Sequence, residues 1–385
     1  MKKYLFFVIF TSILSIFILQ KSNKSDFLHS ELYKSLSKEN FGPLDTEKVL
    51  YINVGIDYIP YELIEIFEKL TGVTVVPDIF DSNEILEAKL LAGGAQYDIV
   101  FPTAWPHFSR QLKAGIYQKI DKTKIDYKIF EKDILDRLAE YDSENSYGIP
   151  YQFGISGIGI DEKIINVIAG DAPKDSLAII FDPVYAKKIS KYRISVYESS
   201  DEIFPAVLAY LGLNPETENE EDIIKASEHL KKIRNYISKF TSYGFEDLAS
   251  GNACVVLSTS GDILKVRGEN KSSDIKFLFP KEGASLWVDV AAIPVNAKHI
   301  NNIYAFFKFL FHPKVIAFVT NCTSRANAVI DSAKFVDNDL INNKDVYPPL
   351  EIRKKCYIEK PLPAKIEALK TRLLTKIKSM DKNDD

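Results

Sequence analysis

The chain has 385 residues, of which 46% are hydrophobic and 26% charged, which is typical of a globular protein large enough for two lobes. Its formal net charge is −4 at pH 7, and its short basic runs are interspersed with acids. This balance does not attract a polyanion, so we expect no nucleic-acid partner.

The N-terminus has the form of an export signal. Lys2 and Lys3 precede an uncharged apolar stretch over residues 4–19, which is slightly short for a membrane-spanning helix. We therefore expect residues 1–20 to be a signal peptide or a retained membrane anchor. Either reading places the remainder outside the cytoplasm, in the periplasm. Residues 21–47 are polar and mixed, and are predicted to be a polar lead-in, either a tether or a disordered segment.

Residues 49–115 alternate between strand and helix patterns. The expected strands are 49–54, 73–80 and 97–101, and the expected helices are 60–72, 83–94 and 105–115. This order predicts an α/β lobe with a mostly parallel sheet. Residues 147–161 are rich in glycine and β-formers and read as an extended segment that leaves this lobe. A second α/β pattern follows over 163–285, and residues 299–321 predict a helix interrupted at Pro313.

The motifs of common enzymes are missing from the sequence. The segment GISGIG at 154–159 has the wrong spacing for a dinucleotide loop, and neither a Walker A loop nor a nucleophile elbow occurs. The five histidines are scattered, and no cysteine–histidine spacing fits zinc. We therefore expect no enzyme activity, no cofactor and no metal. Cys254 is expected to pack in the core. The sequence alone does not decide whether Cys322 and Cys356 form a disulfide.

Acidic and aromatic residues, with one threonine, instead gather where expected strands end. They are Asp57, Tyr58, Thr103, Trp105, Glu202, Asp262, Trp287 and Asp289. Ligands of open α/β sheets bind at the carboxyl ends of strands. Carboxylates beside aromatic rings suit an organic cation, through ion pairing and cation–π contact. Trp287 and Asp289 lie two apart in one apolar run, so they should share a strand face.

Four stretches carry a resemblance to a known family: FDSNEILEAKLLAGGAQYDIVFPTA, RQLKAGIYQKIDKTKI, FPKEGASLWVDVAAIP and VYPPLEIRKK. With them, the chain from about 48 to 378 resembles the periplasmic polyamine-binding proteins of bacterial ABC transporters, and most closely the putrescine-binding branch. The resemblance implies an α/β fold of the two-lobed periplasmic binding-protein class (type II), with two crossovers between lobes. Lobe one would hold 48–150 and 290–335, and lobe two 151–289 and 336–385.

The resemblance also implies roles for particular residues. Asp57 and Tyr58 match an Asp-Tyr pair that follows the first strand, and Thr103 matches a serine that bonds an amine. Trp287 matches an aromatic wall of the site. The carboxylates that hold the two ends of a diamine would be Glu202, Asp262 and Asp289.

Several family positions differ in this chain. Gly55 and Ile56 stand where the family has Trp-Ser, Thr259 stands where it has Trp, and Thr323 is aligned with a Tyr. Arg325 follows two residues later, where a cation facing the cleft would disfavour a diamine. Three aromatic platforms are therefore absent from their usual positions, which would weaken putrescine binding unless another ring, such as that of Trp105, replaces one of them.

The resemblance implies an exported solute-binding protein that captures putrescine, spermidine or a related small organic cation and delivers it to an inner-membrane ABC permease. The changed positions leave a second interpretation open, because Arg325 with Thr259 and Ser260 could hold the carboxylate of a basic amino acid. A third interpretation is a membrane-tethered sensor or interaction protein that has lost transport.

Overall fold

The computed structural model describes residues 30–380, except 81, 94–95, 270–273 and 359–361. The predicted signal peptide or anchor at 1–20 lies outside this range. Within the described residues, no single helix has the length and apolar character needed to cross a membrane. One bent pair of helices, Ile300–Leu310 and Pro313–Thr323, meets the length and composition criteria together, with a bend of 70° between them.

One sheet runs through the whole molecule. Its strands are β1 (Val49–Gly55), β2 (Thr74–Phe80), β3 (Ile99–Val100), β4 (Gly148–Asp161), β5 (Ile194–Val196), β6 (Lys239–Phe240), β7 (Val255–Thr259), β8 (Ile275–Leu278) and β9 (Leu286–Ala292). Their order is β2-β1-β3-β9-β4-β7-β5-β6, and β8 pairs with β4. β1 pairs in parallel with β2 and β3, as the alternating pattern predicts, whereas β9 is antiparallel to both of its neighbours.

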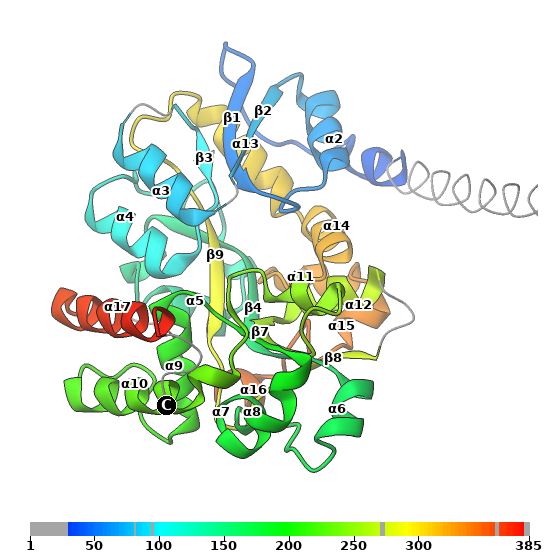
Figure 1. The fold of residues 1–385 in the computed structure, drawn as a ribbon. Helices are drawn as coiled ribbons and strands as arrows, with labels where there is room; N and C mark the ends of the chain where they lie inside the picture. Colours follow the sequence, from blue (N-terminus) through cyan, green and yellow to red (C-terminus); the bar gives the residue numbers. More distant parts are fainter. Residues whose placement is uncertain (1–29, 81, 94–95, 270–273, 359–361, 381–385) are drawn as a thin grey trace, which may run out of the picture.

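The long strand β4 joins the two halves of the sheet. Its first part, 148–155, pairs with β9, and its second part, 156–161, pairs with β7 and β8. Figure 1 shows β4 and β9 side by side at the middle of the molecule, with β1–β3 above and the other strands below. The prediction of an extended connecting segment at 147–161 is therefore confirmed.

Helices cover both halves (Figure 1). Those of the first half are α2 (Tyr61–Thr71), α3 (Asn83–Leu91), α4 (Ser109–Lys113), α5 (Lys132–Leu138), α13 (Ile300–Leu310) and α14 (Pro313–Thr323). The others are α6 (Glu162–Ile168), α7 (Ala178–Phe181), α8 (Pro183–Ile189), α9 (Ser200–Tyr210), α10 (Glu220–Ile233), α11 (Gly244–Ala249), α12 (Ser260–Glu269), α15 (Asn338–Ile341), α16 (Leu350–Arg353) and α17 (Ala364–Lys378). The predicted interruption at Pro313 is confirmed, because a proline without N–H is best accommodated at the first position of a new helix.

The apolar side chains form two cores. The first lies around β1, α2 and α13, where the ring of Phe67 packs edge-on against Phe306 and at a tilt against Phe309. The second lies around β5, α9 and α10, and α17 packs into it through Ile366 and Ile377. The C-terminal helix is therefore an integral part of the second half rather than an appendage.

The described part of the lead-in contradicts the prediction of a polar tether. Leu32, Leu36 and Phe41 are buried, and the ring of Phe41 lies 5.8 Å from that of Phe309. The carboxylate of Asp45 accepts hydrogen bonds from Asn301 at the start of α13. Residues 30–47 thus pack on the first half, because three apolar side chains and one capping carboxylate suffice to hold a segment whose average composition is polar.

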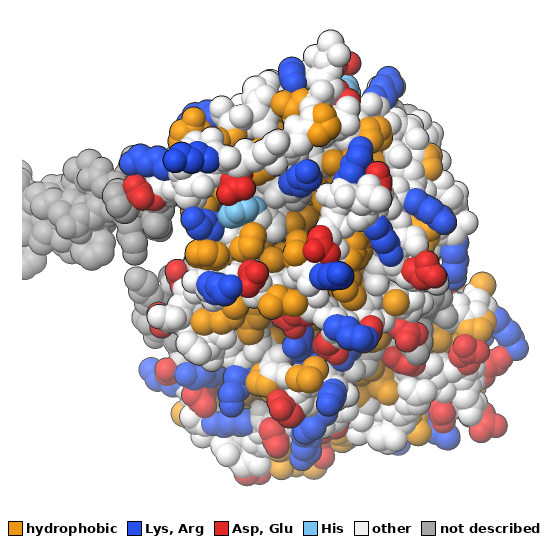
Figure 2. Space-filling model, turned by 180° about the vertical axis from the view of Figure 1, so that it is seen from behind, with side chains coloured by type: hydrophobic (Ala, Val, Ile, Leu, Met, Phe, Trp, Pro, Cys, Tyr) orange, Lys and Arg blue, Asp and Glu red, His pale blue; other side chains and the backbone are white. Residues whose placement is uncertain are grey.

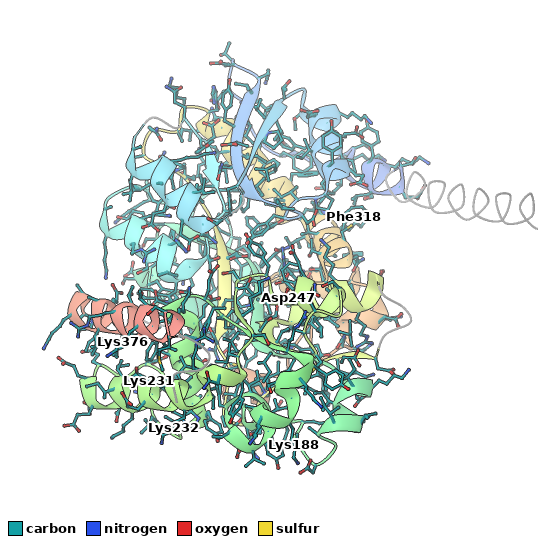
Figure 3. All side chains as sticks on the ribbon, viewed as in Figure 1. Lys188, Lys231, Lys232, Asp247, Phe318 and Lys376 are labelled. Atoms are coloured by element: carbon teal, nitrogen blue, oxygen red, sulfur yellow. The ribbon has the colours of Figure 1, made fainter. Side chains whose placement is uncertain are left out.

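The outer surface carries both signs of charge. On the face shown in Figure 2, lysine and arginine side chains are interspersed with aspartate and glutamate. Figure 3 shows Lys188, Lys231, Lys232 and Lys376 on the outer helices of the lower half, away from β4 and β9. These cations therefore do not face the centre of the sheet, where the candidate site lies.

Candidate functional site

Asp289 is the central carboxylate of the site. It lies in β9 and is only 2% exposed, and the Thr103 hydroxyl donates a hydrogen bond of 2.7 Å to its Oδ1. Thr103 follows β3 and forms a β-bridge with Asp289, which fixes this contact through the backbone. The Tyr58 hydroxyl, from the loop after β1, forms a second hydrogen bond.

Burial raises the pKa of Asp289 above its ordinary value, although the bonds from Thr103 and Tyr58 and the charge of Arg325 act in the opposite direction. The raised pKa means that the site does not fully compensate the buried negative charge. A cation that enters next to this carboxylate would supply the missing compensation. Burial also raises the pKa of Tyr58, and the nearby Asp289 carboxylate raises it further.

Trp287 lies two residues before Asp289 on the same strand, so the two side chains share one face, as predicted. Its backbone pairs with Gly154 of β4, and a Cβ built on Gly154 would come within 2.4 Å of the indole ring. Only glycine lets the ring lie flat across the neighbouring strand. The indole Nε1 is buried and has no hydrogen-bond partner among the described residues.

Asp262 forms the opposite end of the site, in the first turn of α12. Thr259 at the end of β7 donates a hydrogen bond of 2.8 Å to Asp262 Oδ2, and Arg325 Nη2 donates one of 3.3 Å to Asp262 Oδ1. The guanidinium of Arg325 also lies 5.2 Å from the centroid of the Tyr58 ring. Burial alone would lower the pKa of Arg325, but Tyr58, Asp262 and Asp289 favour its charged form and raise it.

The structure therefore brings most of the predicted residues together. One cluster contains Tyr58, Thr103, Thr259, Asp262, Asp289 and Arg325. Thr323 lies next to it at the end of α14, where its hydroxyl accepts hydrogen bonds from the Gln152 amide and from the Arg325 backbone, each 3.3 Å long. Thr323 thus supports the segment that carries Arg325.

Three predicted residues lie apart from the cluster. Asp57 is 61% exposed in its side chain and forms an ion pair of 2.6 Å with Lys265 of α12. Trp105 is buried, and its ring stacks on that of Tyr141 at 6.1 Å. Glu202 of α9 lines a small cavity.

A small cavity lies beside Glu202, and neither Asp262 nor Asp289 lines it. It is lined by Tyr197 together with residues of β4, α9 and the segment before β9. Burial raises the pKa of Tyr197, and both Glu202 and Asp262 raise it further, so this phenol lies within the field of the two carboxylates.

Sequence reasoning missed Gln152. It lies opposite Asp289 in the β4–β9 pairing and is 1% exposed, and its Oε1 has no hydrogen-bond partner among the described residues. A buried amide oxygen without a partner is costly, and an ammonium donor would satisfy it. The signal was present in the sequence, because Gln152 is the one amide within the apolar run that forms β4, as Asp289 is the one acid in β9.

Within the described residues, no cluster of histidine, cysteine, aspartate and glutamate could hold a metal ion. The three cysteines are free thiols, so the Cys322–Cys356 disulfide that the sequence left open does not form in this structure. Burial raises the pKa of Cys254 to about 12, which agrees with its predicted role as a packed side chain.

Residues 55–317 match the sequence family of the bacterial extracellular solute-binding proteins. The chain belongs to this family. It is 39% identical to the putrescine-binding periplasmic protein SpuD of Pseudomonas aeruginosa and 35% identical to PotF of Escherichia coli, which has the same description. Each alignment covers 86% of this chain and 92% of the relative.

Solved structures of the same fold include a putative spermidine/putrescine ABC transporter protein from Listeria monocytogenes, with a TM-score of 0.75 and 24% identity over 86% of this chain and 99% of that one. The predicted α/β periplasmic binding-protein fold is thereby confirmed. The prediction that the chain is not an enzyme is confirmed by its family, whose members bind solutes without transforming them.

Proposed function

We propose that this protein captures putrescine or spermidine in the periplasm and delivers it to an ABC permease of the inner membrane. The relatives described as putrescine-binding periplasmic proteins support both the ligand class and the compartment. The observation that carries the proposal is the buried carboxylate of Asp289, which is held by hydroxyl groups and needs a cation.

In this proposal Asp289 binds one ammonium group of the ligand. Gln152 Oε1 accepts a hydrogen bond from the same ammonium, because it lies opposite on the paired strand. The indole face of Trp287 and the ring of Tyr58 flank the alkyl chain, since aromatic faces attract methylene groups next to a cation. Asp262, and Glu202 beyond it, receive the other end of the ligand.

We further propose that the protein works as two lobes, 48–150 with 290–335 and 151–289 with 336–385, which close on the ligand with two crossovers between them. The packing of α17 against α9 and α10 supports this division. Two ion pairs would join the lobes at α12: Asp57 with Lys265, and Arg325 with Asp262. Closure contributes to affinity only through contacts that exist in the closed form alone.

The test is calorimetric titration of protein that has been unfolded, stripped of ligand and refolded. We expect saturable binding of putrescine or spermidine at one site. Absence of binding for both amines, with the protein shown to be folded by circular dichroism, would refute the proposal.

A basic amino acid is the second candidate ligand, and the position of Arg325 in the cluster is the observation that favours it. The guanidinium would have to exchange Asp262 for the ligand carboxylate. Titration with lysine and ornithine under the same conditions separates the candidates, because only this second proposal predicts that they bind more tightly than putrescine.

A further inference from the structure

The second half of the molecule contains an open pocket of about 510 Å³, and every residue that lines it is polar or charged. Its volume is in the range of small-molecule sites, about 300–1,000 Å³, but such sites are usually lined mostly by apolar groups. A fully polar lining therefore indicates a small hydrophilic ligand. We propose that this pocket is a second ligand site, which binds an oxyanion of the phosphate class, either free phosphate or a phosphomonoester.

The pocket lies where strands β5, β6 and β7 begin. Arg193 directly precedes β5, Lys239 is the first residue of β6, and Asn252 lies three residues before β7. Because β5 is parallel to both β6 and β7, the three strands begin at the same edge of the sheet. Glu202 and Asp262 follow the other ends of β5 and β7. The pocket is therefore separate from the candidate amine site, at the opposite edge of the same strands.

The charges of the lining favour an anion. Lys239 forms an ion pair of 3.0 Å with the buried Asp247, which also accepts a hydrogen bond of 2.8 Å from the Ser195 hydroxyl. Lys191 and Arg193 also line the pocket, and neither forms an ion pair with any residue that the structure describes. Three cations and one carboxylate leave two positive charges in excess, which is the charge that a doubly ionised phosphate would compensate.

Arg193 is held in an unfavourable backbone conformation. Its φ of 66° and ψ of 140° are uncommon for residues other than glycine. The backbone is fixed on both sides, because the Arg193 N–H donates to Ser190 O at 3.1 Å and its carbonyl accepts from the Cys254 N–H at 3.1 Å. Strained residues of this kind are concentrated at ligand sites. An arginine where glycine would fit better therefore indicates a role for its side chain.

The side chains around Arg193 provide the donors that a phosphate group requires. Its guanidinium is a planar fork that matches two oxygens of a phosphate, and its Nη1 is oriented by a hydrogen bond of 3.4 Å to Asn252 Oδ1. The Ser238 hydroxyl accepts a hydrogen bond of 3.2 Å from the Ile194 N–H, so its own proton is left for a ligand. With the ammonium of Lys191, donors from three segments converge on one pocket.

Calorimetric titration of the wild-type protein with inorganic phosphate, at an ionic strength kept constant with sodium chloride, tests the proposal. We expect saturable binding at one site. A parallel titration with glycerol 3-phosphate distinguishes the two sources, because the probe that binds more tightly identifies free phosphate or a phosphomonoester as the ligand. Absence of saturable binding for both probes would overturn the proposal.

Lys191→Gln and Arg193→Gly should each weaken the binding of the tighter probe on the order of tenfold, the scale of one lost charge-assisted hydrogen bond. An unchanged affinity in either variant would overturn the proposal. Glycine adopts the backbone conformation of Arg193 without strain, so the ligand-free Arg193→Gly protein should unfold at a temperature no lower than the wild type. A lower unfolding temperature with unchanged affinity would show that the arginine serves the fold alone.

Lys188→Gln is the matched control. It removes a lysine three residues before Lys191, but Lys188 does not line the pocket and forms an ion pair of 2.8 Å with Asp171. We expect the phosphate affinity of this variant to equal that of the wild type. A loss as large as that of Lys191→Gln would show that the general charge of this surface, and not the pocket, attracts the anion, and would overturn the proposal.

A variant of the amine site tests whether the two sites are separate. Asp289→Asn should bind phosphate as the wild type does, and Lys191→Gln should bind putrescine as the wild type does, in the same calorimeter. Phosphate binding that disappears in Asp289→Asn would show that the anion enters the amine site instead, and would overturn the proposal. A protein that binds phosphate but no polyamine would refute the proposed function and leave the second site standing.

Discussion

Asp98 and Asp289 are equally buried, each 2% exposed, yet their surroundings differ. Asp98 accepts hydrogen bonds from the backbone N–H groups of Tyr51, Lys298 and His299, and its Oδ2 lies 2.8 Å from the imidazole Nδ1 of His299. It therefore ties β1 to the start of α13. Asp289 receives two side-chain hydroxyls, from Thr103 and Tyr58.

This difference separates a structural carboxylate from a binding one. A carboxylate has about four lone-pair positions. At Asp98 the protein fills them with donors from two segments, β1 and residues 298–299, so no capacity remains for a ligand. At Asp289 two positions are filled, and the unpartnered Oε1 of Gln152 lies on the opposite strand. Burial alone would not have told the two residues apart.

The largest effect is expected for Asp98→Ala. It leaves buried backbone donors and an imidazole without their acceptor, so the free energy of unfolding should fall by about 3–5 kcal/mol. Chemical denaturation of the ligand-free protein measures this loss. Protein that remains folded should bind putrescine with wild-type affinity, and a binding defect at full folding would contradict the structural role.

Asp289→Asn should do the opposite of Asp98→Ala: it should weaken ligand binding without lowering the stability of the fold. The affinity for putrescine should fall by about 2–3 kcal/mol, or roughly 30- to 150-fold, because a buried charge pair with the ammonium is lost. The ligand-free variant should be at least as stable as the wild type, since a poorly compensated buried charge is removed. Calorimetry and thermal unfolding on the same samples test both parts, and an unchanged dissociation constant would refute the binding role.

Substitutions of the two tryptophans should differ in the same way, but with smaller effects on affinity and stability. Trp287→Leu should weaken putrescine binding by about 1 kcal/mol, the scale of one cation–π contact. Trp105→Leu should leave the affinity nearly unchanged and lower the thermal stability instead, because Trp105 stacks on Tyr141 rather than facing Asp289. Equal losses of affinity in both variants would show that Trp105 also contacts the ligand.

Near neutral pH, the dependence of ligand affinity on pH should be the smallest of these effects. Because the pKa of Asp289 is raised in the ligand-free protein, affinity should decrease as the pH falls through that pKa and the carboxyl becomes protonated. The stability contribution of this group has the reverse sign: it is present at low pH and is lost as the pH rises through the raised pKa. Titrations from pH 8 downward should show this decrease in the wild type and a flatter profile in Asp289→Asn.

The sequence was enough to predict helices and strands of the fold and part of the candidate binding site. Because side chains alternate along a strand, the spacing of Trp287 and Asp289 predicted that they share one face. The run of glycine and β-forming residues at 147–161 predicted the extended strand β4. The contacts of Arg325 could not be predicted, because its partners Tyr58 and Asp262 lie far away in the chain and meet it only through the fold. The polar average composition of residues 21–47 concealed the few apolar side chains, such as Leu36, that dock residues 30–47 on the first half.

The central claim is that Asp289 anchors an amine which the protein captures in the periplasm. Native mass spectrometry of the wild-type protein and of Asp289→Asn, both purified without refolding from cells that contain polyamines, tests it most directly. The account predicts that the wild type carries a bound polyamine and that the variant does not. A wild type that carries no amine, or a variant that carries the same amine to the same extent, would contradict it.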